Sequence, residues 1–383
     1  RSDSMQNKPL NIAIIELGSH HEVLWSVYHQ CREAYEHTHV LTTRQNHDIL
    51  AQELKNDYLS SIHIKENKVS TTAFMDAVSE VLSNCQHILI TTVLPKDYQY
   101  FCQWEARHRS LLLLHDLHFH FASDEYKLSP VTPRQVVELI TYKVGDYQRL
   151  ASLLALQYRC LVCSESVLQY ARAQHYESVV DYIDLGYSPT PAALAVSHDS
   201  STEVPKDSIV IVIAGSISCK RRNYQPVLKA LSQTSSDTHM TITLAGRAES
   251  SADLYILDNF KQLARANLEV ISSAHELSHE TYLRCLAEAD YLLLPISPHK
   301  EVSAVRECYG HSTHSGALHD VTRYGTKAII SAHYPIQSSI ANLMIPYRDS
   351  ESLTTILNSC QPQKAVAYQY KSRRSILELF RHI

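Results

Sequence analysis

The feature that most constrains the fold of this chain is an alternation of short apolar runs with helical segments. Helices are expected between the apolar runs of the first half, because their apolar residues recur with helical spacing. Short strands separated by helices form parallel βαβ units, so the first half should build a sheet that is covered on both faces. We expect its strands at residues 11–17, 40–43, 61–65, 87–92, 111–115, 160–164 and 179–184.

The same alternation restarts after a segment rich in Pro, Ser, Thr and Asp, which is typical of a linker. Further strands are expected at 209–214, 240–245, 268–271, 291–295 and 328–331. A chain of 383 residues also exceeds the usual size of a single core. We therefore predict an α/β fold of two doubly wound, Rossmann-like domains that face each other across a cleft. The expected parts are an N-terminal domain at 5–187, a linker at 188–208, a C-terminal domain at 209–365, and a helix at 366–383 that could pack back on the first domain.

The composition excludes some classes of protein. With 35 basic and 40 acidic residues, the chain has a formal net charge of -5, so a nucleic acid is not expected as a partner. No apolar run approaches the roughly 20 residues that span a bilayer, and no signal-peptide pattern is seen. Nine cysteines, an odd number, predict reduced thiols and a cytoplasmic protein. Peripheral association with the inner face of a membrane stays open, although no strongly basic amphipathic helix is found.

The stretch from 309 to 332 has the pattern of a phosphate site. A turn at Tyr309 and Gly310 leads to Ser315 and Gly316, a helix is expected at 317–324, and an apolar strand follows. Unpaired N–H groups and the positive end of the dipole at a helix start attract anions. An ordinary, well-capped αβ unit would show the same pattern.

Several motifs of the second half occur in a characteristic order. They are AGS at 214–216 with CKRRNY at 219–224, LAGR at 244–247, ADYLLLP at 289–295, RECYG at 306–310, and SGALHDVTRYGTKAIIS at 315–331. This series resembles the donor-binding domain of the GT-B glycosyltransferases, most nearly the large retaining family 4. The resemblance implies the GT-B architecture, a nucleotide-diphosphate sugar such as a UDP- or GDP-sugar as co-substrate, and no metal or other cofactor. The paired glutamates of that family are absent: Asp320 stands where the second is expected, and Glu307 is the nearest candidate for the first.

A basic loop and the helix start are the expected donor site. We expect at least one of Lys220, Arg221 and Arg222 to bind diphosphate oxygens, the alternative being a solvated basic loop. Asp320 or Glu307 would hold sugar or ribose hydroxyls, or would instead be a charge that satisfies a helix dipole. The other expected donor-binding residues lie in the motifs above: Gly215, Ser216, Asn223, Arg247, Tyr309, Gly310, Ser315 and Gly316.

His115 and Asp116 are the candidate catalytic residues, because they follow a strand of leucines and should point into the cleft. The resemblance places a histidine near here in contact with the donor sugar. In a retaining enzyme His115 would orient hydroxyls, and in an inverting enzyme His115 or Asp116 could act as the base.

Four further histidines are candidates for binding the acceptor. His20 and His21 lie on the turn after the first strand and either face the cleft or simply begin a helix. His118 and His120 alternate with two phenylalanines, which predicts that both lie on one face. That spacing suits a metal as well, but no third ligand is evident nearby, so no metal site is expected.

These observations predict a glycosyltransferase that moves a sugar from a nucleotide-diphosphate sugar to a glycan or lipid-linked acceptor, in bacterial surface polysaccharide or glycan biosynthesis. Two alternatives stay open. One is a sugar-nucleotide epimerase of the same two-domain plan, and the other is a catalytically inactive, glycosyltransferase-like binding subunit.

Overall fold

The computed structural model describes residues 11–53, 61–121, 127, 133, 136–137, 140, 146–186, 208–248, 250–273, 277–302, 305–363 and 375–382. Apart from Ser208, the expected linker lies outside these residues. Within them, no helix combines the length and the apolar character that crossing a membrane requires.

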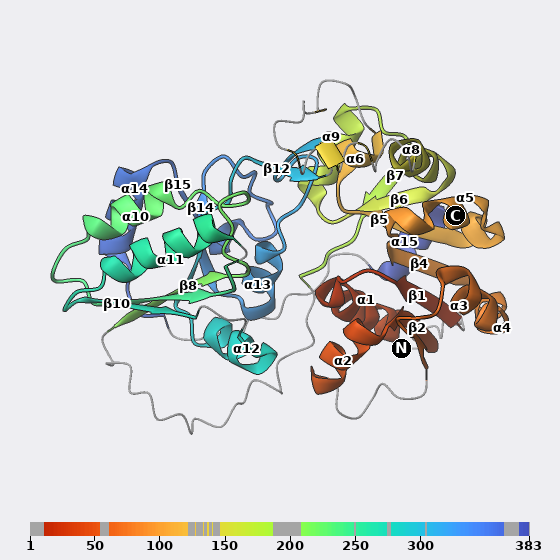
Figure 1. Ribbon diagram of the computed structural model, residues 1–383, viewed down its shortest axis with the longest axis horizontal. Coiled ribbons are helices and arrows are strands. Elements are labelled where there is room, and N and C mark those ends of the chain that lie inside the picture. Colours follow the sequence, from red (N-terminus) through yellow and green to blue (C-terminus); the bar gives the residue numbers. More distant parts are fainter. Residues whose placement is uncertain are drawn as a thin grey trace, which may run out of the picture.

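The N-terminal domain is built on a parallel sheet of seven strands in the order β3-β2-β1-β4-β5-β6-β7 (Figure 1). The strands are β1 (Asn11–Glu16), β2 (His37–Thr43), β3 (Ile62–Lys65), β4 (His87–Thr92), β5 (Ser110–Leu114), β6 (Arg159–Val162) and β7 (Val179–Tyr182). The helices are α1 (His21–Ala34), α2 (Arg44–Glu53), α3 (Thr71–Ala77), α4 (Ser79–Ser83), α5 (Tyr98–Gln103), α6 (Leu117–Phe121), α8 (Tyr147–Gln157) and α9 (Glu165–Ala173). The strand order reverses between β1 and β4, which is where α/β sheets bind ligands.

The C-terminal domain repeats this plan with six strands in the order β10-β9-β8-β11-β14-β15. They are β8 (Ile209–Ala214), β9 (Met240–Ala245), β10 (Leu268–Ser272), β11 (Tyr291–Leu294), β14 (Lys327–Ser331) and β15 (Met344–Tyr347). The helices are α10 (Gln225–Ser232), α11 (Ser251–Gln262), α12 (His279–Ala287), α13 (Ala317–Tyr324) and α14 (Ser350–Ser359). Its strand order reverses between β8 and β11.

The predicted α/β architecture is confirmed, and every strand expected from the sequence is found within a few residues of its expected place. Three strands were not expected. One is the edge strand β15, and the other two are β12 (His299–Val302) and β13 (Val305–Cys308), which pair antiparallel as a separate hairpin. We call the strand pair β12 and β13 the interdomain hairpin, because Figure 1 shows β12 reaching from the C-terminal domain toward α6 and α9.

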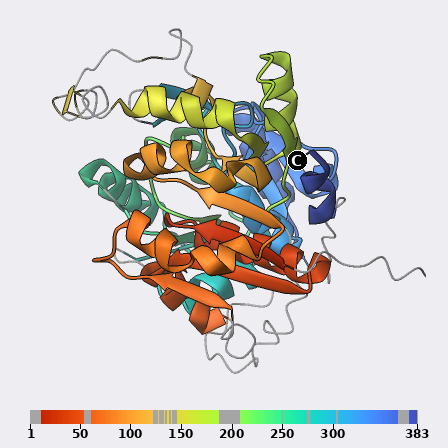
Figure 2. The ribbon, with the colours of Figure 1, turned by 90° about the vertical axis from the view of Figure 1, so that its right-hand side faces the viewer.

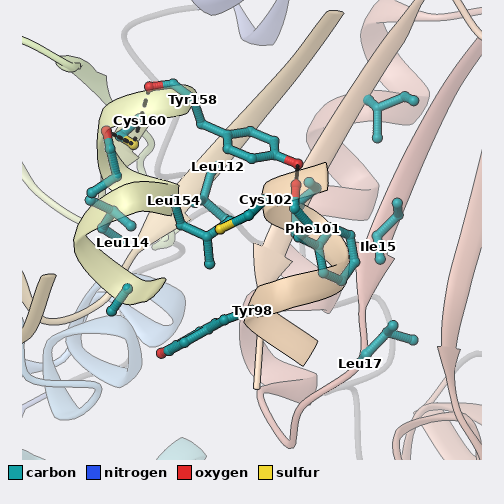
Figure 3. Close-up of a cluster of buried hydrophobic side chains, with 14 of the residues drawn as sticks. Ile15, Leu17, Tyr98, Phe101, Cys102, Leu112, Leu114, Leu154, Tyr158 and Cys160 are labelled. Carbon is teal, nitrogen blue, oxygen red and sulfur yellow. Dashed lines mark hydrogen bonds between the residues drawn. The ribbon is translucent and has the colours of Figure 1, made fainter. Parts of the chain in front are cut away.

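Apolar side chains fill both faces of each sheet. On one face of the N-terminal sheet, Phe101 of α5 packs among Ile15, Leu112 and Leu154 (Figure 3). At the edge of this cluster the Tyr158 hydroxyl donates a hydrogen bond of 2.9 Å to the Phe101 carbonyl, so its buried polar atom is satisfied. This face of the N-terminal sheet, which includes β5, is therefore packed with apolar side chains, and the buried Tyr158 hydroxyl among them is hydrogen-bonded.

The last helix, α15 (Ile376–Leu379), packs on the N-terminal domain although it follows the C-terminal domain in the chain. Ile376, Leu379 and Phe380 join the core beneath α1, and Phe380 stacks on His87 with ring centroids 4.3 Å apart. Figures 1 and 2 both show α15, in dark blue, beside elements of the N-terminal domain. The chain thus crosses between the domains a second time.

Replacing Phe380 by Ala should lower the free energy of unfolding of the N-terminal domain by about 3 kcal/mol, because the ring is 4% exposed and its removal leaves a cavity. Urea unfolding followed by tryptophan fluorescence measures this change. Arg381→Ala is the control, since Arg381 is exposed and adjacent. Equal stability of the two variants would contradict the packing described here.

Candidate active site

The turn after β1 is held by a buried carboxylate. Glu16 is 0% exposed and accepts hydrogen bonds from the hydroxyls of Thr91 (2.6 Å) and Thr92 (2.7 Å) and from the Gly18 N–H (2.8 Å). A Cβ on Gly18 would lie 2.6 Å from Thr92 Cγ2, so the close approach requires glycine. Burial raises the pKa of Glu16, against the charge of His20. Glu16, which was not among the residues expected from the sequence, fixes the turn that carries His20.

His20 stacks on His115, with ring centroids 4.4 Å apart and planes 11° from parallel. The structure therefore brings together one expected acceptor residue and one expected catalytic residue. His21 begins α1 instead and lies 3.9 Å from the Glu22 carboxylate.

The structure corrects the prediction that His115 could act as a base. Its Nε2 lies 2.8 Å from the Thr91 carbonyl, which can only accept, so Nε2 carries the proton. Its Nδ1 lies 3.7 Å from the Cys163 sulfur. Burial and the neighbouring His20 lower the pKa of His115 to about 3. Both ring nitrogens are thus engaged inside the N-terminal domain, and the ring stays neutral.

Asp116 is also engaged, which corrects its expected role as a base. Its carboxylate lies 2.6 Å from the Lys300 ammonium of β12, and the two side chains are 17% and 20% exposed. Burial opposes ionisation of Asp116, but Lys300 outweighs it, so the pKa of Asp116 is lowered. The pair joins the end of β5 to the interdomain hairpin.

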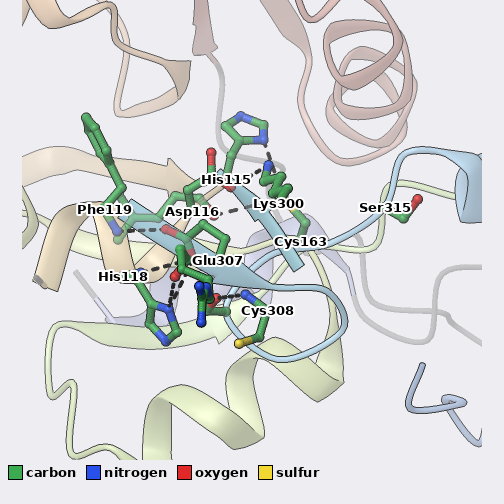
Figure 4. A network of polar contacts seen from close by, with 12 residues as sticks. His115, Asp116, His118, Phe119, Cys163, Lys300, Glu307, Cys308 and Ser315 are labelled. Carbon is green, nitrogen blue, oxygen red and sulfur yellow. Dashed lines mark hydrogen bonds and ion pairs between the residues drawn. The ribbon is translucent and has the colours of Figure 1, made fainter. Parts of the chain in front are cut away.

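The carboxylate of Glu307 completes this joint, as Figure 4 shows. Glu307 is 0% exposed, and its oxygens accept from the N–H groups of His118 (3.2 Å) and Phe119 (2.7 Å) at the start of α6. The Leu117 N–H donates to the Ser312 carbonyl at 2.9 Å. Of the two roles expected for Glu307, the structure shows the helix-start carboxylate and not a free ligand for donor hydroxyls, because its oxygens accept from the start of α6.

The prediction that His118 and His120 share one face was wrong, because α6 is a helix and residues two apart point in different directions. His118 is 0% exposed; its Nδ1 lies 2.7 Å from the Arg306 carbonyl and its Nε2 lies 2.7 Å from the Tyr170 hydroxyl. His120 Nδ1 lies 2.8 Å from the Asp116 carbonyl, and burial lowers the pKa of this histidine. His118 is a structural residue of the domain joint, not part of an acceptor surface.

In the C-terminal domain, Arg222 lies at the reversal point between β8 and β11. Its guanidinium donates to the Ala214 carbonyl at the end of β8, and its backbone bridges to Ile296 after β11. Gly215 has φ +82°, a conformation that suits glycine, and a Cβ there would lie 2.9 Å from Arg222 Nη2. Arg222 thus packs over the first glycine of the expected donor site.

The other expected residues of this region differ in exposure. Ser216 is partly buried, and the Asn223 N–H donates to the Pro295 carbonyl at 2.8 Å. The exposed side chains are Lys220, Arg221, Asn223 and Arg247.

Helix α13 begins and ends where the sequence predicts, with Gly325 in the left-handed conformation at its end. The Ser315 N–H donates to the Tyr334 hydroxyl at 3.3 Å. Gly316 is exposed, and a Cβ there would contact no protein atom within 4 Å. The space in front of the α13 start is therefore open.

Tyr309 and Gly310 support this loop from inside, which corrects their assignment to the donor surface. Tyr309 is 7% exposed and packs in the core. Gly310 has φ +79°, and a Cβ on it would lie 2.3 Å from Pro335 Cδ. Both residues shape the loop that leads to α13.

Asp320 of α13 accepts a hydrogen bond of 2.9 Å from the Tyr282 hydroxyl. Burial raises the pKa of Asp320 to about 6, with a further rise from Glu22 of α1 in the other domain, while Arg323 and Arg222 oppose the rise. The pKa of Asp320 thus responds to Glu22 of the N-terminal domain and to Arg222 of the loop after β8.

Two histidines at this junction were missed by the sequence analysis. His314 and His319 stack with ring centroids 4.9 Å apart, and the pKa of His319 responds to His115 and His20 of the other domain. We call His20, His115, His314 and His319 the junction histidines. The chain contains 23 histidines, so the sequence alone did not single out these two. Among the described residues, no His, Cys, Asp and Glu side chains form a group that could hold a metal.

Comparisons with known proteins identify the fold. No protein-family model matches the sequence, and no curated protein matches it significantly. Among solved structures, Anabaena HepE in complex with UDP-glucose is 13% identical, with 92% of this chain and 89% of that chain covered and a TM-score of 0.52. The N-terminal domain of Candida albicans trehalose-6-phosphate phosphatase is 13% identical, with 94% and 90% covered and a TM-score of 0.53. Neisseria meningitidis UDP-GlcNAc 2-epimerase bound to UDP-GlcNAc is 10% identical, with 91% and 89% covered and a TM-score of 0.50.

The chain has a GT-B-like fold. The architecture expected from the motif resemblance is therefore confirmed. In this GT-B-like fold the interdomain hairpin joins the two domains at one edge, and the junction histidines lie between them.

Removing the Lys300 charge should destabilise the protein, because Asp116 would keep a largely buried, uncompensated charge. Lys300→Met should lower the free energy of unfolding by about 3 kcal/mol, and adding Asp116→Asn should restore part of the loss. Urea unfolding of the two single variants and the double variant measures the coupling. As a control, Arg44→Met should cost less than about 1 kcal/mol, since Arg44 and Glu66 are paired on the surface. Strictly additive losses for Lys300 and Asp116 would refute the pairing.

Glu307 should make stability depend on pH. Burial, with a contribution from Asp116, raises the pKa of Glu307 from 4.5 to about 8. Between these values the folded state holds the proton more tightly than the unfolded state, so stability falls as pH rises. From pH 5 to pH 8 the wild type should lose at least about 1 kcal/mol more than Glu307→Gln, which does not titrate. Urea unfolding at both pH values checks this, and parallel pH profiles would count against it.

Proposed function

We propose that the protein is a glycosyltransferase that transfers a sugar from a nucleotide-diphosphate sugar to a glycan or lipid-linked acceptor, without a metal. The observation that carries the proposal is the open start of α13, which lies in the same domain as the Arg222 guanidinium at the β8/β11 reversal point. A guanidinium and a helix start are the groups that stabilise a departing diphosphate when no metal is bound. The similar structures of Anabaena HepE and the Neisseria epimerase, which hold UDP-glucose and UDP-GlcNAc, support a nucleotide sugar as the ligand.

The proposed mechanism does not depend on a side-chain base from β5. His115 is neutral with both nitrogens engaged, and Asp116 is paired with Lys300. Transfer would then rely on positioning the two substrates and on stabilising the charge that develops on the diphosphate. His20 stacks on His115, and its ring nitrogens have no hydrogen-bond partner within the described part of the chain, so we assign it to positioning a substrate.

The acceptor side of the proposal rests on the N-terminal domain. His20 and Glu22 come from the turn and helix that follow β1, and Glu22 acts on Asp320 across the junction. We propose that a cytoplasmic enzyme of glycan or surface polysaccharide biosynthesis presents its acceptor hydroxyl here.

Nucleotide binding tests this proposal. Isothermal titration calorimetry with UDP, GDP, UDP-glucose and GDP-mannose should show binding by at least one of them. Arg222→Ala should weaken that binding by roughly ten- to a hundredfold, because a hydrogen bond to a charged group is lost. Gly316→Val should weaken it while leaving stability unchanged, since the added side chain meets no protein atom and occupies the space before α13.

Lys261→Ala is the control for charge, because Lys261 lies exposed at the end of α11 in the same domain. If none of the four ligands binds, the proposal fails. If UDP-GlcNAc alone yields free UDP and an epimer, the protein is instead an epimerase. Binding without turnover on any acceptor would indicate an inactive binding subunit.

A further inference from the structure

The junction histidines form two stacked pairs, one from each domain. His20 and His115 belong to the N-terminal domain, and His314 and His319 belong to the C-terminal domain. The pKa of His319 is lowered by burial and then by His314, Arg323, His115 and His20, in that order. Asp116, which follows His115, forms an antiparallel bridge with Thr313, which precedes His314, so the two pairs lie near each other.

The outer member of each pair is anchored within its own domain. His115 has both nitrogens engaged, as described above. His314 Nδ1 lies 3.2 Å from the Tyr334 hydroxyl, and burial, with Lys300, lowers the pKa of His314 to about 4. His115 and His314 therefore serve as fixed, neutral supports on which His20 and His319 stack.

His319 and His20 have ring nitrogens that are not hydrogen-bonded within the described residues. His319 Nε2 is shielded from water and has no hydrogen-bond partner among the described residues. A buried nitrogen without a partner costs about 1–3 kcal/mol, so its retention calls for a reason outside folding. The ring nitrogens of His20 likewise make no hydrogen bond within the described residues.

His319 is placed beside the proposed diphosphate position. It lies in the first turn of α13, and its own N–H donates to the Gly316 carbonyl at 2.9 Å. The N–H groups of Gly316 and Ala317 form no hydrogen bond within the described residues, so they can face an anion. An anion at this helix start would therefore lie close to the His319 ring.

We propose that His319 and His20 contact the diphosphate of the bound nucleotide sugar from opposite domains, and that His319 takes up a proton as it binds. This inference rests on the proposed function, because it assigns residues to the same donor site. Four groups act on His319: His314 and Arg323 from its own domain, and His115 and His20 from the other. Glu16 interacts with His20. Without ligand, burial and these neighbours keep the pKa of His319 low. The negative charge of a diphosphate favours the protonated ring, so ligand and proton bind together.

The test uses UDP-glucose and GDP-mannose, whose diphosphates carry no group that titrates near pH 7. Calorimetry at pH 6.0, 7.0 and 8.5, in two buffers of different ionisation enthalpy, gives both the affinity and the number of protons taken up. In the wild type the affinity should rise about tenfold as pH falls from 8.5 to 6.0, with net proton uptake. In His319→Gln the affinity should vary less than about threefold over that range, with reduced uptake. His20→Gln should show a smaller change in the same direction.

His239→Gln is the matched control, because His239 is exposed and precedes β9, at the edge of the sheet away from the site. Unfolding midpoints of all variants separate loss of binding from loss of the fold. If a nucleotide sugar binds with the same affinity and proton uptake in the wild type and His319→Gln, the inference is overturned and the proposed function stands. If neither ligand binds the wild type, both fail.

Discussion

The contact between the Glu307 carboxylate and the start of α6 is the constraint on which the arrangement of the two domains depends. A helix of five residues has little stability of its own. Here its first N–H groups are satisfied by a carboxylate and a carbonyl from the other domain. Separating the domains at this edge would leave those groups and the charges of Asp116 and Lys300 without partners. The hairpin therefore acts as a fixed joint between two otherwise independent sheets.

This joint also sets the geometry of the candidate site, because both of its sides continue directly into it. On the N-terminal side, His115 immediately precedes Asp116 and α6. On the C-terminal side, β13 leads through Tyr309 and Gly310 to Gly316 and α13. A shift of the hairpin against α6 would move the two pairs of junction histidines relative to each other. The packing of the two domains therefore determines the geometry of the candidate site.

Local sequence patterns were sufficient to predict the helices and strands within each domain, but they could not predict the contacts between the domains. Helix α13 could be predicted to the residue, because Gly325 and the apolar spacing are local features. The interdomain hairpin could not be predicted, because its charged residues Lys300 and Glu307 are paired with groups of the other domain. For the same reason the sequence left it open whether Glu307 binds a ligand or satisfies a helix start. The alternation of His118 and His120 with phenylalanines wrongly suggested that both histidines share one face. The proposed roles of Arg222 and Gly316 stay predictions from the motif resemblance.

The acidic residues at the junction bear on whether a diphosphate could bind there at all. Burial raises the pKa values of Glu16, Asp320 and Glu307, so the folded protein favours their neutral forms more than a count of carboxylates suggests. Asp116 stays charged but is neutralised by Lys300. Groups that can attract an incoming anion in this region are the Arg222 guanidinium and the N–H groups at the start of α13. In a junction of low dielectric constant these few groups act strongly, which suits a site that stabilises a leaving diphosphate without a metal.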